Sequence, residues 1–399
     1  MKYVVILFDG MADLPDEKGE TPMSLARKPF TDRLAQTARV GLCATVPDGL
    51  KPGSDVANLS VLGYDPRACY TGRSPLEALS MGIPLNENSV CYRCNLVTLS
   101  DEQNYADKTM LDYSAGEIST EEARELIAFV DQKLGTPDLQ FHGGISYRHC
   151  LKRPNGRTGA VLTPPHDISD KKIANYLPEG AYAEQLRHIQ QQSYQLLKDH
   201  PVNVARKKKG QNPANSVWLW GEGTKPQLQN FTERTGLRGA MISAVDLLKG
   251  IAVGAGMTNI HVAGATGNLH TDFCGKAQAA VQALQTHDFV YIHIEAPDEC
   301  GHQGDKTGKT RAIELIDEKV VSYVCRALDE QGEPYRLLIL PDHPTPYTLK
   351  THTAQPVPFL LFDAARPQNG VPAFTEKTAA QTGNFVTPGH TLIQKLIER

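Results

Sequence analysis

The stretch FVYIHIEAPD, residues Phe289–Asp298, is an apolar run of strand length that ends in acidic residues. Two further runs have the same form: YVVILFD at Tyr3–Asp9 and LLILPDH at Leu337–His343. Continuous apolar runs of about four to eight residues are typical of strands that are buried on both faces of a parallel sheet. Ligands of open α/β sheets bind at the carboxyl ends of the strands. Three acids at three such ends therefore predict a ligand site.

Other segments extend this alternation of strands and helices. Further strands are predicted at Val217–Leu219, Ile260–Val262 and Phe359–Phe362. Between the later strands, Thr310–Leu328 carries apolar residues at helical spacing, and Gly332 follows as a helix terminator. The pattern predicts an α/β fold with a mostly parallel sheet covered by helices on both faces.

The middle of the chain has a different pattern. One strong helix is predicted there, because Ser119 and Glu122 have capping-box spacing ahead of an apolar stripe that ends at Gly135. Strands are predicted around it at Asn95–Leu99, Leu139–Tyr147 and Ala160–Leu162. We expect a small α+β domain at residues 86–182, inserted into a core domain made of residues 1–85 and 183–399.

Composition excludes several classes of partner. The chain has 399 residues and a formal net charge of −4, which gives no electrostatic footprint for nucleic acid or an anionic membrane. The short basic run Arg206–Lys209 is interpreted as a solvated loop. No apolar segment approaches the roughly 20 residues of a membrane span. Eight scattered cysteines, including the lone pair Cys91 and Cys94, are typical of reduced, structural thiols. We therefore expect a cytoplasmic protein that binds neither nucleic acid nor a membrane.

Histidines near the acids indicate metal binding. Asp298 and His302 are four residues apart, so both lie on one face if the chain turns helically there. Asp342 and His343 are adjacent, just before prolines that end the strand, and His352 follows. Carboxylate oxygen together with imidazole nitrogen suits zinc or manganese better than calcium or magnesium. The ligands suffice for two ions.

A pair of metal ions favours a phosphate-like substrate, because two cations stabilise both the attacking and the leaving oxygen. Ser54 is a candidate nucleophile, since the Pro52-Gly53 turn precedes it and a helical pattern runs from it to Leu62. Helix N-termini attract phosphate through their free N–H groups and dipole. Taken alone, the same position also fits an N-capping serine.

Taken together, the motifs resemble a known family. They are, in order, Phe8–Gly10, Pro52–Asn58, Asp298–Asp305 (DECGHQGD), Asp342-His343 and His352–Pro358. This set is similar, over essentially the whole chain, to the cofactor-independent phosphoglycerate mutases of the alkaline phosphatase superfamily, in the branch first seen in archaea.

The resemblance implies a role for each matching residue. Asp9, Ser54, Asp342 and His343 would hold one divalent ion, Mn²⁺ or Zn²⁺, and Asp298, His302 and His352 the other. Ser54 would take the phosphoryl group from 3-phosphoglycerate, and glycerate would accept it back at its 2-hydroxyl, with no 2,3-bisphosphoglycerate required. The fold would be alkaline phosphatase-like, with the inserted domain as a cap that excludes water.

Three arginines are candidate anion clamps: Arg73, Arg148 and Arg153, since a guanidinium binds phosphate or carboxylate bidentately. Each one fits an ordinary surface residue equally well. His390 also suits a metal ligand, but the resemblance assigns the third histidine to His352 and leaves His390 at a helix start.

Alternatives to the mutase stay open. The segments 295–298 and 340–346 are closer to a bacterial subgroup proposed to act as a homoserine kinase. A phosphatase or phosphodiesterase would use the same metals, and a non-catalytic binding protein would need no ligand set. Thr307–Thr310 has the ending of a phosphate-binding loop, but Gln303 stands where its first glycine belongs, so we predict no such loop. None of these motifs specifies an oligomeric state.

Overall fold

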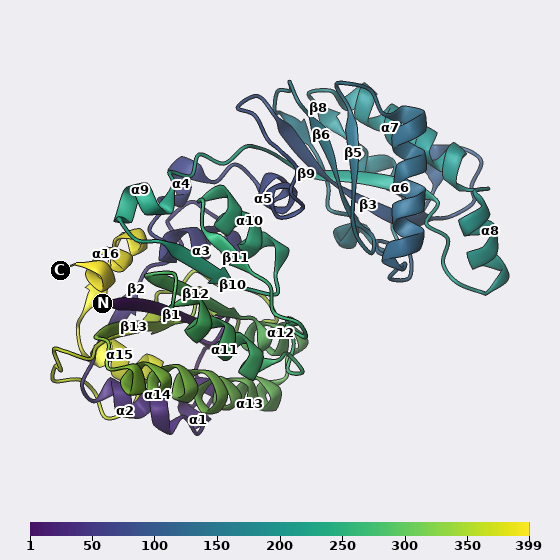
Figure 1. The fold of residues 1–399 in the computed structure, drawn as a ribbon. Helices are drawn as coiled ribbons and strands as arrows, with labels where there is room; N and C mark the ends of the chain where they lie inside the picture. Colours follow the sequence, from purple (N-terminus) through teal and green to yellow (C-terminus); the bar gives the residue numbers. More distant parts are fainter. Residues whose placement is uncertain (399) are drawn as a thin grey trace. The chain divides into compact units, whose positions relative to one another are not determined.

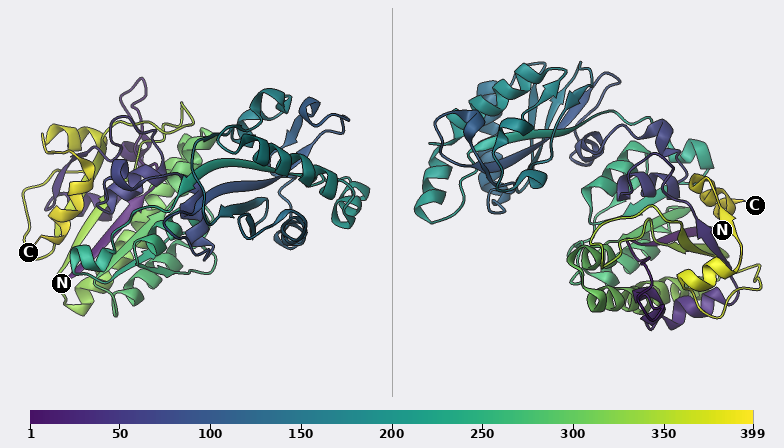
Figure 2. Two further views of the ribbon diagram at one scale, coloured as in Figure 1. Left: turned by 90° about the horizontal axis from the view of Figure 1, so that it is seen from above. Right: turned by 180° about the vertical axis from the view of Figure 1, so that it is seen from behind.

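The computed structural model describes residues 1–398, which divide into two compact units. The larger unit consists of Met1–Tyr70 and the segment that starts at Gln227, and it contains both chain ends (Figures 1 and 2). The smaller unit is Thr71–Pro226. An insertion was expected, but the boundaries predicted at residues 86 and 182 are wrong, because the smaller unit extends further at both ends.

The larger unit is built on an eight-stranded sheet in the order β11-β10-β12-β1-β13-β14-β2-β15. Neighbouring strands are parallel except at β14, which is antiparallel to both β13 and β2. The central strands β12, β1 and β13 are almost completely buried, which explains why they are apolar without alternation. The strands are β1 (Lys2–Phe8), β2 (Arg39–Cys43), β10 (Gly239–Ile242), β11 (Thr258–Ile260), β12 (Phe289–Ile294), β13 (Tyr335–Leu340), β14 (Val357–Asp363) and β15 (Phe385–Val386).

Helices cover both faces of this sheet, as predicted (Figure 1). On one side lie α11, α13 and α14 with α1, α2 and α15, and on the other lie α3, α10 and α16. Their bounds, with those of the three further helices α4, α9 and α12, are α1 (Pro22–Leu25), α2 (Pro29–Ala35), α3 (Ser54–Val61), α4 (Pro66–Cys69), α9 (Phe231–Thr235), α10 (Asp246–Gly254), α11 (Phe273–Ala283), α12 (Ala296–Gln303), α13 (Lys306–Ile316), α14 (Ser322–Gln331), α15 (Glu376–Gln381) and α16 (Leu392–Ile397).

The helix predicted at Thr310–Leu328 is longer in the structure and contains a π-helical turn at Asp317–Val321, between α13 and α14. Asp317 in that turn is buried and accepts hydrogen bonds from the N–H and hydroxyl of Thr31, at 2.7 and 2.6 Å. Gly332 ends α14 with φ 67°, the left-handed conformation that favours glycine at this position.

The smaller unit has an antiparallel five-stranded sheet in the order β4-β3-β6-β5, with β9 paired to β3. Helices α6 and α7 pack on one face of it, and the hydroxyl of Ser119 caps α6 by accepting from the Glu122 N–H at 3.2 Å, as predicted. The elements are α5 (Arg73–Ser80), β3 (Val90–Leu99), β4 (Met110–Asp112), α6 (Thr120–Leu134), β5 (Gln140–Ile145), β6 (Arg148–Arg153), β7 (Ala160–Val161), β8 (Glu179–Gly180), α7 (Ala183–Leu197), α8 (Pro201–Lys208) and β9 (Ser216–Thr224).

Strand β9 explains the boundary error. The run Val217–Leu219 was expected in the core sheet, but β9 pairs with β3 over most of its length. Helix α7 packs against β9, and α5 packs against β9 and β3, so the segments on both sides of the predicted insertion belong to it. An apolar run identifies a strand, but it does not tell which of two sheets that strand joins.

The structure also bears on the expectations for the basic run, for the cysteine pair and for membrane spans. The basic run Arg206–Lys209 is not a solvated loop but the end of α8, where the buried Arg206 pairs with Glu122 at 2.6 Å. Cys91 and Cys94 are buried free thiols three residues apart on β3, and side chains at that spacing point to opposite faces of a strand. Among the helices described, none combines the length and the apolar character needed to cross a membrane.

Candidate two-metal active site

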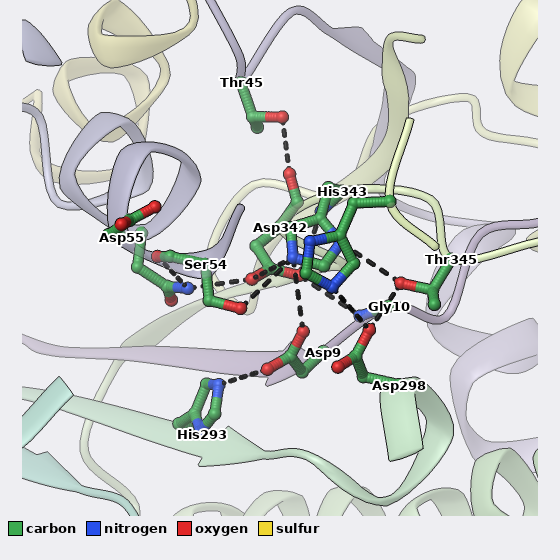
Figure 3. Close-up of polar contacts among 12 residues, drawn as sticks. Asp9, Gly10, Thr45, Ser54, Asp55, His293, Asp298, Asp342, His343 and Thr345 are labelled. Atoms are coloured by element: carbon green, nitrogen blue, oxygen red, sulfur yellow. Dashed lines mark hydrogen bonds and ion pairs between the residues drawn. The ribbon is translucent and has the colours of Figure 1, made fainter. Parts of the chain in front are cut away.

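Three carboxylates meet at one edge of the larger sheet (Figure 3). Asp9 follows β1, Asp342 follows β13, and Asp298 lies in the first turn of α12, directly after β12. The three strands are neighbours and run parallel, so their carboxyl ends share one edge. The ligand site predicted from the three acid-ended runs is therefore assembled by the topology.

The first cluster consists of Asp9, Asp342 and His343, all of them buried, with one ligand atom of each within 4.8 Å of the others. His343 Nε2 lies 3.4 Å from Asp342 Oδ2 and 3.7 Å from Asp9 Oδ1. The other Asp342 oxygen accepts from the N–H groups of Gly10 at 3.1 Å and of His343 at 2.9 Å. These two bonds fix the orientation of the Asp342 carboxylate within the cluster.

The second cluster brings together Asp298, His302 and His352. The Nε2 atoms of the two histidines are 2.8 Å apart, and they lie 3.3 and 3.4 Å from the Asp298 oxygens. Asp298, His343 and His352 also satisfy the geometry of a metal group, so His343 adjoins both clusters. The predicted grouping of the seven metal-site residues corresponds to these two clusters, with Ser54 beside the first.

Electrostatics favour a cation at this site. Burial, and then the neighbouring Asp342 and Asp298 carboxylates, raise the pKa of Asp9 well above its ordinary value. Asp9 Oδ1 is buried and has no hydrogen-bond partner among the described residues. An unpartnered buried carboxylate oxygen is costly, and a bound cation would remove that cost. Carboxylates and imidazoles at this spacing fit divalent metal ions.

The charges of the second cluster also favour a bound cation. Burial opposes ionisation of Asp298, but hydrogen bonds from His302 and His352 hold its pKa well below the usual range. The hydrogen bond to Asp298 raises the pKa of His302 to about 9. In the absence of an ion, protons thus take the place that a metal would hold between these side chains.

Ser54 is the first residue of α3, and Gly53 occupies the N-cap position, so Ser54 is not the capping serine that was the alternative. Its hydroxyl points to the first cluster and lies 3.1 Å from His343 Nε2 (Figure 3). Asn58, one turn later, donates to the Ser54 carbonyl and to Asp342 Oδ2, both at 2.8 Å. The amide of Asn58 therefore ties the helix that carries the nucleophile to a metal-site carboxylate.

Two supporting side chains were not predicted as part of the site. His293 Nε2 lies 2.9 Å from Asp9 Oδ2, and its Nδ1 lies 3.1 Å from the Ser243 hydroxyl. Burial lowers the pKa of His293 to about 4, so the ring is neutral at neutral pH. Thr345 contacts both Asp298 and His343. The only sequence signals were a histidine inside an apolar strand and a threonine next to the Asp342-His343 motif.

The segment Thr307–Thr310 has a structural role. Lys309 is buried in α13, and its ammonium donates to Asp13 Oδ2 at 2.6 Å, to the Thr345 carbonyl at 2.7 Å and to the Ala12 carbonyl at 3.1 Å. The lysine is thus fully engaged in holding the loops that carry the site. This arrangement agrees with the prediction that the segment is not a phosphate-binding loop.

The smaller unit carries a separate arginine cluster. Glu77 binds Arg73 Nε at 2.8 Å and Arg93 Nε at 3.0 Å, and the Arg93 guanidinium lies 4.2 Å from the ring centre of Trp220. Burial, with Arg73 and Arg148 nearby, lowers the pKa of Arg93 to about 10. We call Arg73, Arg93, Arg148 and Trp220 the arginine face. Arg93 was not predicted as a site residue. The signal in the sequence was that it is the one charged residue in the run VCYRCNLVTL, Val90–Leu99.

Arg148 and Arg153 do not share a face, which corrects the expectation that both point to the same substrate. They stand five residues apart on β6, opposite Asn95 and Val90 of β3, and odd spacing puts them on opposite sides of the sheet. Arg153 lies on the helix-covered side, where it stacks on Tyr182 at 3.8 Å and donates to Gln185 of α7 at 2.8 Å.

His390 lies in a short 3₁₀ turn, Gly389–Thr391, and belongs to neither metal cluster among residues 1–398. His352, in contrast, lies within contact distance of His302 and Asp298. The assignment of the third histidine ligand to His352, and not to His390, stays a prediction.

The chain is similar to known proteins. A family model described as 2,3-bisphosphoglycerate-independent phosphoglycerate mutase matches residues 35–203. The chain is 49% identical over 402 residues to a protein from Geobacter sulfurreducens named probable 2,3-bisphosphoglycerate-independent phosphoglycerate mutase, with 100% of both chains covered. It is also 49% identical over 399 residues to the mutase of that name from Methanothrix thermoacetophila, again with full coverage of both.

Two solved structures share the fold. A protein from Pyrococcus horikoshii, 28% identical, superposes with a TM-score of 0.83 over 100% of this chain and 96% of that one. The cofactor-independent phosphoglycerate mutase from Thermoplasma acidophilum, 23% identical, superposes with a TM-score of 0.69 over 100% and 99% of the two chains. Since relatives with this name match it along its whole length, the chain belongs to the 2,3-bisphosphoglycerate-independent phosphoglycerate mutase family.

Proposed function

We propose that the protein is a metal-dependent phosphoglycerate mutase that interconverts 3-phosphoglycerate and 2-phosphoglycerate through a phosphoserine at Ser54. The observation that carries the proposal is the position of Ser54: it opens a helix and points its hydroxyl at His343, the residue that adjoins both metal clusters. The full-length similarity to mutases supports the choice of substrate.

Two divalent ions held by the six cluster residues and Ser54 would supply positive charge for the phosphoryl oxygens and would lower the pKa of the Ser54 hydroxyl. The protein itself orients the nucleophile. Asn58 fixes the first turn of α3, and the N–H groups of that turn face the anionic substrate. In this structure the Ser54 hydroxyl lies 3.1 Å from His343 Nε2, beside the first cluster.

The reaction is two displacements at phosphorus. In the first, Ser54 Oγ forms a bond to phosphorus while the bond between phosphorus and the C3 oxygen breaks, and that oxygen takes up the proton that Ser54 loses. In the second, the C2 hydroxyl oxygen of the bound glycerate attacks the phosphoserine, its proton returns to Ser54, and 2-phosphoglycerate leaves. No external phosphate donor is needed.

The smaller unit would act as the cap that holds glycerate between the two displacements. Its arginine face offers guanidinium groups next to an aromatic ring, which suits a carboxylate of a small acid. Trapping the acceptor matters because any water that reaches the phosphoserine would hydrolyse it. We assign Arg93 and Arg148 to glycerate binding and leave Arg153 to the packing of α7.

The test is phosphorus NMR of the metal-loaded protein, with 3-phosphoglycerate in one sample and with homoserine plus ATP in another. We expect the 2-phosphoglycerate signal to grow only in the first sample. Phosphohomoserine in the second sample would favour a kinase, and inorganic phosphate alone in the first would favour a hydrolase. Ser54→Ala should be folded, bind metal and show no turnover; substantial turnover with metal content confirmed would disprove the nucleophile.

The identity of the ions is tested with the chelated protein. We expect Mn²⁺ or Zn²⁺ to restore activity after chelation, and Ca²⁺ to fail, because the imidazole-rich second cluster disfavours a cation that prefers oxygen ligands. Restoration by Ca²⁺ alone would contradict the assignment.

A further inference from the structure

The hydroxyl of Thr345 lies between the two metal clusters. It donates a hydrogen bond to Asp298 Oδ1, and its Oγ1 is 3.2 Å from His343 Nδ1 (Figure 3). The side chain is completely buried, so water does not compete for either bond. One hydroxyl thus contacts a ligand of each cluster.

The direction of the two bonds follows from proton counting. A hydroxyl has a single hydrogen, and an ionised carboxylate can only accept. If Thr345 donates to Asp298, its oxygen must accept from His343, so the His343 proton resides on Nδ1. The lone pair of His343 is then on Nε2, the atom that faces Ser54 and the first cluster.

The backbone holds Thr345 in this orientation. Its N–H donates to the Ala12 carbonyl at 3.1 Å, and its carbonyl accepts from the buried Lys309 at 2.7 Å. Glycines on two sides make room for the side chain: a Cβ at Gly10 would lie 2.6 Å from Thr345 Oγ1, and a Cβ at Gly301 would lie 2.8 Å from its methyl group. The hydroxyl is therefore fixed before any ion binds.

We propose that Thr345 is a positioning residue that couples the two metal clusters: through one hydroxyl it fixes the tautomer of His343 and the orientation of Asp298. The inference rests on the metal site of the proposed function, but not on its substrate. Groups that orient metal ligands typically change metal affinity by about 10- to 100-fold when they are removed. Here one side chain should affect both ions.

The test compares Thr345→Val, which keeps the shape and removes the hydroxyl, with Thr345→Ser, which keeps the hydroxyl. Thr353→Val is the matched control, because the Thr353 hydroxyl is also buried in this loop but has no hydrogen-bond partner among the described residues. Mn²⁺ is titrated calorimetrically into each metal-free protein. We expect Thr345→Val to bind both ions about 10- to 100-fold more weakly, and Thr345→Ser and Thr353→Val to stay near the wild type.

Weaker Mn²⁺ binding at one cluster alone would overturn the coupling. Equal losses of affinity in Thr345→Val and Thr345→Ser would show that the methyl group matters and not the hydroxyl.

A second measurement does not depend on the variants. Nitrogen-15 NMR of the metal-free wild type should show His343 protonated at Nδ1, and protonation at Nε2 would overturn the proposal. A wild type with this tautomer that binds ions but does not convert phosphoglycerate would refute the proposed function alone.

Discussion

At the scale of single residues, the site consists of side chains that are each held by a second side chain. His293 is hydrogen-bonded to Asp9, Asn58 donates to Asp342, and Thr345 donates to Asp298. These bonds hold the three carboxyl groups close to one another at the edge of the sheet. A bound cation would offset their repulsion, which makes metal affinity the property to probe with single substitutions.

His302→Ala and His352→Ala should each lower the metal content from two ions to about one, because each removes an imidazole from the second cluster. His390→Ala should retain both ions, since it lies outside both clusters. Elemental analysis of the dialysed variants gives the stoichiometry. Loss of an ion in His390→Ala together with full content in His352→Ala would show that the histidine assignment is reversed.

Lys276 gives a prediction for pH. It is buried in α11 with its ammonium 3.3 Å from the His293 carbonyl, and burial lowers its pKa to about 8. An unfolded lysine has a pKa of about 10.4, so between the two values the unfolded chain binds the extra proton and stability rises with pH. Relative to Lys276→Met, the wild type should gain about 2 kcal/mol of unfolding free energy between pH 8 and pH 10.

Urea titrations of the metal-free proteins at the two pH values measure this difference. The variant serves as the control, because it removes one titrating group and keeps all others. If the two proteins change in parallel with pH, Lys276 is not deprotonated in the folded state.

At the scale of elements, the two faces of β6 make different predictions for two arginines. Arg148→Ala should lower mutase turnover about 10- to 100-fold, since a lost charged hydrogen bond costs roughly 1.5–3 kcal/mol. Phosphate released to water should rise relative to phosphate transferred. Arg153 lies on the helix-covered side, so Arg153→Ala should mainly lower the unfolding temperature of the smaller unit.

Coupled enzyme assays for 2-phosphoglycerate and for inorganic phosphate separate the two effects. Arg93→Lys keeps the charge but loses the planar guanidinium group. It should therefore lower mutase turnover, but less than Arg148→Ala does. Unchanged transfer in Arg148→Ala with reduced transfer in Arg153→Ala would place the glycerate on the other face.

Elements also show which features can be predicted from the sequence. The strands β1, β12 and β13 were predictable because each is short, apolar and ended by an acid, and the acids mark the site. Strands β2 and β10 were missed, since RVGLC and GAMI carry glycine and little apolar contrast with their surroundings. The sheet to which β9 belongs, and the relation of Arg93 to Trp220, depend on pairing between distant segments, which no local pattern contains.

At the scale of the whole molecule, each unit has its own buried core, and the six residues of the metal clusters, together with Ser54, belong to the larger one. Metal at about 100 times its dissociation constant should therefore stabilise the larger unit by ~2.7 kcal/mol for each ion bound and leave the smaller unit nearly unchanged. Hydrogen exchange resolved by peptide should show added protection in residues 1–70 and from 227 onward. Equal protection in both units would contradict this division.

The division of the chain has a consequence for its synthesis on the ribosome. The smaller unit is continuous, and its ends adjoin where the Thr71 hydroxyl donates to the Thr224 carbonyl at 2.5 Å. The larger unit is not: β1 pairs with β12 and β13, whose residues are translated more than 280 positions later. At roughly 10 residues per second, β1 waits on the order of half a minute for a partner. The smaller unit can therefore be completed before the larger one, while the apolar residues of β1 have neither of these two partners until β12 has been translated.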